Sequence, residues 1–191
     1  MRLNSKLKLG IVSTFVLSGL SACALGVVAA AAGLVVYDGR TLTMMERDAR
    51  IFHLIHTKVV RDPRLADAHV EVTSFNQAVL LVGQTPRASQ RAVAEKIAQA
   101  TPKVRRVYNE LTVAEPIPMA ARSKDTWITG EVRARLVKKK DLESGSIRVV
   151  TEDSVVYLMG VATREQAALA VDVARHVKGV RKVVKVFQYV H

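Results

Sequence analysis

The feature that most constrains this chain is an internal repeat: residues 46–115 recur, with changes, in residues 123–191. Residues 70–83 match residues 147–160 at a constant offset, and two further blocks keep the same order. In these blocks Val104–Val107 lies opposite Val180–Val183, and Ile51, Ile55 and Val59 lie opposite Ile128, Val132 and Leu136. Agreement in three separate blocks predicts two copies of one structural unit.

Each copy is predicted to form a helix, two strands, a second helix and a last strand. Apolar residues at every fourth position predict the first helix, and runs rich in Val predict the strands. Asn76-Gln77 and Asp153-Ser154 are the predicted turns between the first two strands. We expect an α+β fold, with two helices on a three-stranded mixed sheet in each copy. The last strands are predicted at Lys103–Val113 and Val180–Val190.

The starts of the second helices carry further signals. Pro86 suits the first position of a helix, and Glu165 is favourable near the positive end of the helix that is expected to begin at Thr163. Gly83 and Gly160 occupy the same place in the two repeats. They either supply a positive φ where the strand turns toward its helix or are small residues packed under a helix.

The N-terminus is typical of an exported bacterial lipoprotein. Arg2, Lys6 and Lys8 precede an apolar segment, and the only cysteine is Cys23. Leu20-Ser21-Ala22-Cys23 resembles a bacterial lipobox, which implies cleavage before Cys23, diacylglycerol on its sulfur and an N-acyl chain. By the same resemblance Ala24 favours the outer membrane. The alternative is an uncleaved anchor, because residues 9–36 carry no charge and are long enough to span a bilayer.

These observations predict a division of the chain into five parts. The segment after Cys23 is rich in Ala, Val and Gly and is expected to be a tether, with a buried helix as the alternative. The linker is predicted near Pro116 and Pro118. The predicted parts are the signal peptide (1–22), the acylated cysteine and tether (23–45), the first domain (46–115), the linker (116–123) and the second domain (124–191).

The charge of the chain indicates an anionic partner. The net charge is +12, from 29 Lys and Arg against 17 Asp and Glu. An exported protein does not normally meet DNA, so no nucleic-acid partner is expected. Anionic phospholipid, lipopolysaccharide and cell-wall polymers remain. Residues 116–191 carry 14 cations against 8 anions and residues 46–115 carry 11 against 8, so the second domain is the expected lipid binder. The first is then the candidate for contact with an envelope protein.

Three strings of residues make the layout resemble tandem BON-domain lipoproteins: Val79–Gln84, Val107–Glu110 and Asp125–Thr129. The resemblance implies an αββαβ fold, no catalysis and no cofactor. It also implies binding of anionic phospholipid, notably phosphatidylglycerol, and support of outer-membrane integrity, with a possible place at the division site.

Trp127 is the centre of the predicted lipid site. It lies opposite Arg50 in the repeat, so it is expected outside the core, on a helical stripe with Gly130, Glu131, Ala134 and Val137. Trp suits head-group depth, and the helix is crowded with cations. Alternatively, Trp127 packs against the other domain, or the cations only solvate the surface and complement the helix end. The predicted lipid-binding residues are Trp127, Arg133, Ala134, Val137, Lys138, Lys139 and Lys140.

No enzyme or metal signature stands out. His53 and His56 have a spacing that could hold a metal, but no further ligand follows them, so a solvated helix face is the better interpretation. There is no Gly-rich phosphate loop and no Gly-x-Ser-x-Gly motif. The acids Glu95, Glu110, Glu152 and Asp153 are scattered in the pattern. A lipid-binding lipoprotein, a periplasmic adaptor for an envelope-assembly or cell-wall-remodelling protein, and a cell-wall-binding module remain as hypotheses.

Overall fold

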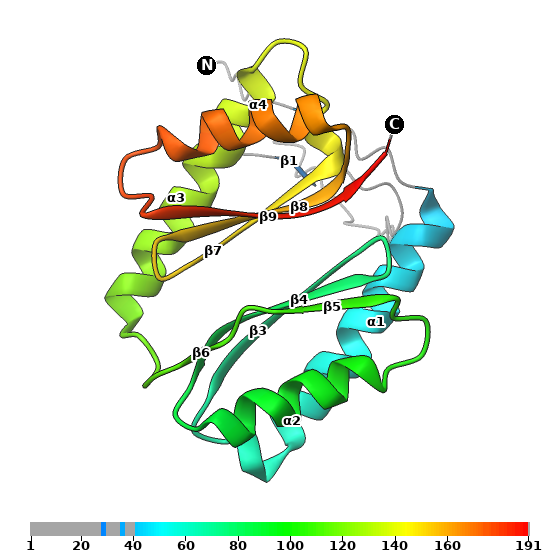
Figure 1. The fold of residues 1–191 in the computed structure, drawn as a ribbon, viewed down its shortest axis with the longest axis vertical. Coiled ribbons are helices and arrows are strands. Elements are labelled where there is room, and N and C mark those ends of the chain that lie inside the picture. The colour runs from blue at the N-terminus through cyan, green and yellow to red at the C-terminus, as the bar shows by residue number, and fades with distance from the viewer. Residues whose placement is uncertain (1–27, 30–34, 37–40, 191) are drawn as a thin grey trace, which may run out of the picture.

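The computed structural model describes residues 28–29, 35–36 and 41–190, and these form two similar α+β units (Figure 1). The first unit contains α1 (Leu42–Arg61), β3 (His69–Phe75), β4 (Ala78–Thr85), α2 (Ala88–Gln99), β5 (Arg106–Asn109) and β6 (Thr112–Val113). The second contains α3 (Met119–Lys138), β7 (Ile147–Glu152), β8 (Val155–Ala162), α4 (Arg164–Arg175) and β9 (Lys182–Tyr189). Short 3-10 turns, η1 (Pro63–Leu65) and η2 (Ser144–Ser146), precede the first strand of each sheet. The predicted order of elements is confirmed.

Both sheets are mixed, as predicted. The strand orders are β3-β4-β5 and β7-β8-β9, with the first pair antiparallel and the second pair parallel in each. In the first unit the last strand is broken, and β6 pairs with β4 further along. Leu111, which lies in the break, is buried in the core of that unit. The predicted strand at 103–113 is therefore two short strands, because one residue turns inward.

A buried aspartate of the first helix holds the hairpin turn in each unit. Both two-residue turns have positive φ, at Asn76 and Gln77 and at Asp153 and Ser154. The Asp48 carboxylate accepts from the backbone N–H groups of Asn76 (2.7 Å) and Gln77 (2.8 Å). In the second unit Asp125 accepts from the backbone N–H of Ser154 at 2.8 Å. These bonds fix the turns although neither turn contains the glycine that such turns favour.

The helix starts differ in part from the prediction. Thr163 is the N-cap of α4, since its Oγ1 accepts from the backbone N–H of Gln166 at 3.2 Å. The predicted start of the second helix in the second unit is therefore confirmed. In the first unit the cap is Arg87, so Pro86 lies outside the helix and its predicted place is wrong. α1 begins at Leu42 and α3 at Met119, so both helices start a few residues before the predicted domains.

Gly83 and Gly160 lie inside β4 and β8, two residues before each strand ends. A Cβ on Gly83 would clash with the carbonyl oxygen of His69, and a Cβ on Gly160 would clash with that of Ser146. Gly83 also has a φ of +123°, which confirms the positive φ for that residue alone. The glycines are needed because the neighbouring strand comes close, so the interpretation as packing under a helix is wrong.

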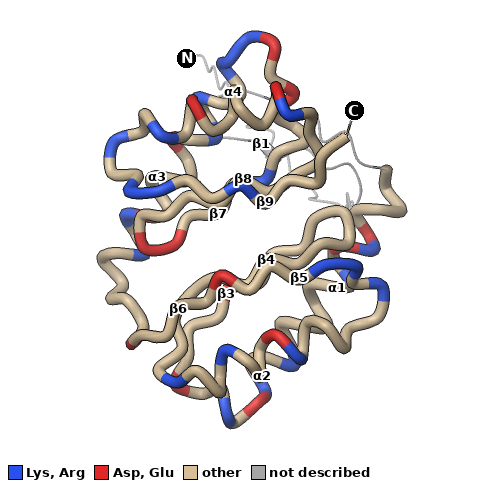
Figure 2. Tube along the Cα trace, in the orientation of Figure 1, with Lys and Arg blue, Asp and Glu red and all other residues tan. Residues whose placement is uncertain are grey.

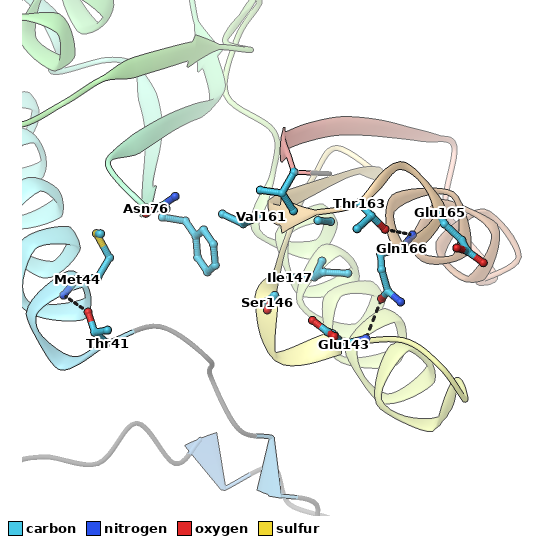
Figure 3. Close-up of a pocket in the computed structure, with 13 residues that line it drawn as sticks. Thr41, Met44, Asn76, Glu143, Ser146, Ile147, Val161, Thr163, Glu165 and Gln166 are labelled. Carbon is cyan, nitrogen blue, oxygen red and sulfur yellow. Dashed lines mark hydrogen bonds between the residues drawn. The ribbon is translucent and has the colours of Figure 1, made fainter.

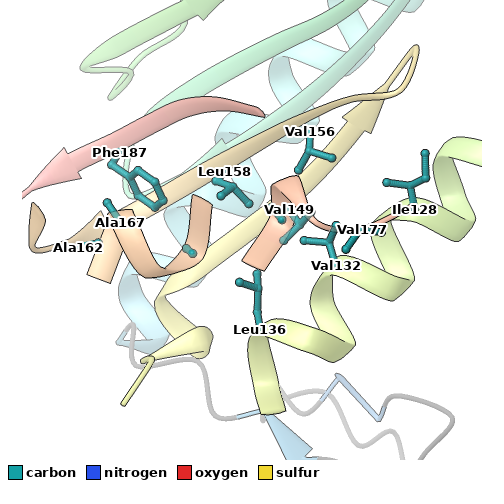
Figure 4. Packing of buried hydrophobic residues seen from close by; sticks show 12 residues of the cluster. Ile128, Val132, Leu136, Val149, Val156, Leu158, Ala162, Ala167, Val177 and Phe187 are labelled. Carbon is teal, nitrogen blue, oxygen red and sulfur yellow. The ribbon is translucent and has the colours of Figure 1, made fainter. Parts of the chain in front are cut away.

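Each unit has a core between its helices and the outer face of its sheet. In the second unit Ile128, Val132 and Leu136 of α3 pack against Val149 and Leu158 of the sheet (Figure 4). In the first unit Ile51, Ile55 and Val59 of α1 pack in the same way with Val72, Val79 and Leu81. The apolar positions on which the repeat was recognised are therefore core positions in both copies.

A third core lies between the two sheets. Its buried residues come from both units: Phe75, Ala78, Leu80, Val82, Val150, Tyr157, Met159 and Val186. The sheets pack face to face and the helices cover the outside, so the molecule has the layers helix, sheet, sheet and helix (Figure 1). Every residue of β4 is buried, which explains its continuous apolar run, since a strand covered on both faces does not alternate.

The N-terminal predictions fall largely outside the described residues. Cys23, the signal peptide and all of residues 9–36 except 28–29 and 35–36 lie outside the described residues. Within the predicted tether, β1 (Val28–Ala29) pairs antiparallel with β2 (Val35–Val36). Among the residues that the structure describes, no helix is both long and apolar enough to cross a membrane.

Candidate functional site

The outer face of α3 exposes the only tryptophan. Ile128, Val132 and Leu136 bury the inner face of the helix, whereas Trp127 is 54% exposed. The prediction that Trp127 lies outside the core is confirmed. The alternative that it packs between the domains is wrong, because the domains meet through their sheets and α3 lies on the outside.

The surface beside Trp127 is open. Gly130 and Glu131 are one turn away, Ala134 is two turns away and Lys138 is three turns away, so these residues share one side of the helix. A Cβ on Gly130 would meet no atom within 4 Å. Ala134 and Val137 are half-buried. A flat strip of small residues therefore extends from the indole ring toward the C-terminal end of α3.

Two of the cations on α3 are engaged within the protein. Arg133 is an exposed residue, but its Nη2 donates to the Val149 carbonyl at 2.9 Å. The guanidinium group therefore covers part of the edge of β7. Burial lowers the pKa of this guanidinium, and the Glu71 carboxylate opposes that shift. Arg135 donates from Nε to Glu131 at 2.7 Å and from Nη1 to the His176 carbonyl at 3.1 Å. Arg133 is thus engaged with β7, and Arg135 neutralises Glu131 at the border of the strip beside Trp127.

Lys138, Lys139 and Lys140 remain available to a partner. All three are exposed at the C-terminal end of α3, and none makes an ion pair with another described residue (Figure 2). The last helical residue is Lys138, and Lys139 is the C-cap. Of the seven predicted lipid-binding residues, the structure brings Trp127, Ala134 and Lys138 onto one line. It places Lys139 and Lys140 at the end of that line, Val137 beside it and Arg133 on another side.

The equivalent face of α1 is different. Arg50 is exposed opposite Trp127 in the repeat. The Phe52 ring, 41% exposed, stacks on His56 with the ring centroids 5.3 Å apart. His53 is exposed, and no acid or further histidine of the described residues joins the pair in a possible metal cluster. The face of α1 thus lacks a tryptophan, and its last turn carries Lys58 and Arg61 instead of three consecutive lysines.

A polar cluster at the boundary between the domains was missed by the sequence analysis. His69 and Glu71 of β3 meet Glu152 of β7, and one ligand atom from each lies within 4.8 Å of the others. Burial raises the pKa of Glu71, nearby Glu152 raises it further, and Arg133 opposes the shift. The interpretation of Glu152 as an isolated acid is therefore wrong. The available signal was that His69 and Glu71 are two apart on a strand and so share a face.

A pocket also lies between the domains, but its chemistry does not suit an anionic head group. Its volume is about 570 Å³, and it is bounded by the start of α1, the β3–β4 turn and the start of α4 (Figure 3). The ionisable residues that line it are Glu143 and Glu165, both acidic. Glu143 is further tied to Gln166, whose Oε1 accepts from its backbone N–H at 2.9 Å. Like charges would repel a phosphate here, so the outer face of α3 is the better candidate.

The repeated αββαβ units define the class of protein. The family model for the BON domain matches residues 47–115 and again residues 124–190. The chain belongs to the BON-domain family and carries two copies of the domain.

Comparison with individual proteins narrows the class. The chain is 35% identical over 185 residues to the outer membrane lipoprotein DolP of Haemophilus influenzae. The matched residues cover 96% of this chain and 95% of that protein. This similarity supports the predicted class of outer-membrane lipoprotein. The chain is also 36% identical over 124 residues to the 21 kDa hemolysin of Actinobacillus pleuropneumoniae, and the match covers 65% of this chain and 64% of that protein. The osmotically-inducible protein Y of Escherichia coli is 27% identical over 139 residues, covering 71% and 69%.

Proposed function

We propose that this outer-membrane lipoprotein is a binding module that docks on anionic phospholipid, phosphatidylglycerol in particular, through the outer face of α3. The observation that carries the proposal is the exposed Trp127 at the start of an open strip that ends in Lys138, Lys139 and Lys140. Acylation of Cys23 would hold the protein at the membrane, facing the periplasm, and α3 would add a second, reversible contact.

The chemistry of the strip supports this proposal. An indole ring is amphipathic and is favoured at the level of the lipid head groups. Each lysine near an anionic surface contributes about 1 kcal/mol. Three such lysines give weak binding that an acyl anchor makes durable, because stable attachment takes two signals. α3 is on the outside of the layered molecule, so docking needs no separation of the domains.

The role that follows is a structural one in the envelope. A module that binds lipid would act by its position, supporting the integrity of the outer membrane. Enrichment at the division site would follow if its anionic lipid is concentrated there.

Trp127 fluorescence tests the proposal, since the chain has one tryptophan. Residues 41–191 would be titrated with vesicles of phosphatidylcholine alone and with vesicles that also contain phosphatidylglycerol. We expect a blue shift only with the anionic vesicles. The variant Lys138→Gln/Lys139→Gln/Lys140→Gln should lose it. Cosedimentation of Trp127→Ala should show weaker binding to the same vesicles.

A matched variant separates a site from general charge attraction. Lys58, Lys96 and Lys103 are exposed in the first domain, and changing all three to Gln removes the same charge. This control should keep the blue shift. Equal loss in both triple variants, or an unchanged spectrum with anionic vesicles, would show that α3 is not a lipid site.

A second candidate function is an adaptor that binds an envelope-assembly or cell-wall-remodelling protein through the first domain. The observation that favours it is on α1, where Phe52 and Val60 are exposed two turns apart, Val60 by 68%. Phe52→Glu with Val60→Glu should then abolish capture of the partner from envelope extracts while the vesicle-induced blue shift remains. Unchanged capture would argue against an adaptor surface on α1.

A further inference from the structure

We propose that His69, Glu71 and Glu152 form a divalent metal site that joins the two BON domains. Two of these residues come from β3 of the first domain and one from β7 of the second. One potential ligand atom from each residue lies within 4.8 Å of the other two. The site is independent of the lipid-binding proposal, because neither Trp127 nor the lysines after it take part.

The pleat of the strands places the three side chains together. Val70 and Val72 of β3 point into the helix-covered core of the first domain, whereas Phe75 points into the core between the sheets. Side chains alternate along a strand, so His69 and Glu71 face the other sheet with Phe75. On β7, Val150 faces the core between the sheets, and Glu152, two residues further, shares that face.

The spacing of the groups fits two ligands of one ion. The distance from His69 Nε2 to Glu152 Oε2 is 3.7 Å, which is too long for a hydrogen bond. Ligand atoms of a tetrahedral site with bonds near 2.1 Å are about 3.4 Å apart. The His69 and Glu152 atoms are therefore already close to the separation of two ligands, and the Glu71 oxygen, within 4.8 Å of both, would move in to complete the site.

The negative charges of the two carboxylates favour binding of a cation in the cluster. The Glu152 side chain is 7% exposed, and the Glu71 carboxylate lies near it. Two carboxylates that face each other in a partly buried place disfavour each other's charge unless a cation lies between them. The nearby Arg133 makes no hydrogen bond to Glu71 that would close the cluster, since its Nη2 donates to the Val149 carbonyl.

A second layer of hydrogen bonds already orients the most buried ligand. Glu152 Oε1 accepts from Gln84 Nε2 at 2.7 Å. The Gln84 amide is itself fixed, because its Oε1 accepts from the backbone N–H of Ile117 at 3.1 Å. These bonds leave Glu152 Oε2 directed at His69, and such outer contacts are what hold ligands in metal sites.

The donor set selects the class of ion. One imidazole nitrogen and two carboxylate oxygens suit Zn²⁺, with a fourth position for water. Mg²⁺ and Ca²⁺ prefer oxygen ligands throughout and larger ligand numbers. Because the ligands come from both domains, a bound Zn²⁺ would stabilise their packing, and the unfolding temperature would rise with the concentration of free Zn²⁺.

Calorimetry and thermal unfolding with Zn²⁺ test the site. The full mature chain in detergent, free of affinity tags and stripped with a chelator, would be titrated with Zn²⁺ in excess Mg²⁺. We expect one ion per chain and a rise in the melting temperature. Glu71→Gln keeps the shape of an exposed side chain and should weaken Zn²⁺ binding by about tenfold or more. His69→Asn should do the same.

The control is the other histidine pair. His53→Asn with His56→Asn should leave both the affinity and the thermal shift unchanged. Loss of binding in that variant, equal binding by the wild type and Glu71→Gln, or no thermal shift with Zn²⁺ would each overturn the proposal. In those cases the cluster is an ion pair between His69 and Glu152 only.

Discussion

At the scale of single residues, the two repeats use the same aspartate differently. Asp48 accepts from two backbone N–H groups and from the Ser74 hydroxyl (3.3 Å). Asp125 accepts from one backbone N–H, and its buried Oδ2 has no hydrogen-bond partner among the described residues. A buried carboxylate oxygen without a partner is costly, so the second aspartate stabilises its turn less than the first.

This difference predicts unequal losses of stability. Asp48→Ala leaves the turn N–H groups without acceptors and should lower the free energy of unfolding by about 2–3 kcal/mol. Asp125→Ala should cost less, because it also removes an unsatisfied oxygen. Urea unfolding followed by circular dichroism measures both. Equal losses, or a larger one for Asp125→Ala, would contradict the assignment.

Tyr157 predicts a pH dependence in the alkaline range. Burial, with smaller contributions from Glu110 and Glu152, raises its pKa from 10.0 to about 12. The unfolded chain then loses this proton before the folded one does. The stabilisation is complete below about pH 10 and is lost as the pH rises to about 12, by about 3 kcal/mol in all. Urea unfolding over this range should show a flatter profile for Tyr157→Phe, and parallel profiles would refute the shift.

How far single residues could be predicted depends on whether the two repeats disagree. Trp127 was placed outside the core because Arg50 stands at its position in the other copy, and this comparison was sufficient. Asp48 and Asp125 agree between the copies but are charged, so they resemble ordinary solvated residues of a helix. They are buried because they bind a hairpin turn that is far away in sequence, and such a contact produces no periodic pattern in the sequence.

At the scale of elements, helix and strand types were predictable and the ends were not. Apolar spacing located α1, α3 and the strands, since periodicity follows directly from burial on one face. The break between β5 and β6 was missed because it depends on Leu111 alone turning inward. The start of α3 was missed because Pro116 and Pro118 suggested a linker, whereas Pro118 is the N-cap of the helix.

Two glycines in different elements predict changes of opposite sign. Gly83→Ala would force a Cβ onto the His69 carbonyl at a φ of +123°, so it should destabilise the protein by about 2 kcal/mol or more. Gly130→Ala places a methyl group in open space within a helix and should stabilise by up to about 1 kcal/mol. Thermal unfolding of the two variants gives the signs. A destabilising Gly130→Ala would show that the surface of α3 is not open.

At the scale of the whole molecule, the core between the sheets makes the domains one unit. The continuous apolar runs of β4 and β8 are typical of strands covered on both faces, which the sequence analysis did not recognise. They did not indicate what covers the second face, and a second copy of the protein would satisfy the same pattern. The exposed face of α3 around Trp127 was easier to predict than the cluster of His69, Glu71 and Glu152, since α3 is one continuous segment and the cluster needs both domains in place.

Coupling across this core can be measured. Leu80 belongs to the first domain but packs in the core between the sheets. Leu80→Ala should cost about 2–5 kcal/mol and should speed amide exchange in β8 and β9 as well as in β3 and β4. Hydrogen exchange with mass spectrometry resolves these strands. Faster exchange confined to the first domain would mean that the two domains unfold separately.

The face-to-face sheets also determine what a broken chain would do. The segment from Ala114 to Ile117 is the covalent connection, but the apolar core between the sheets is what holds the halves together. A protease that nicked this segment would therefore leave a non-covalent heterodimer, with α1 on one piece and Trp127 on the other. Such a pair would stay assembled, and its two halves would behave as the subunits of a dimer.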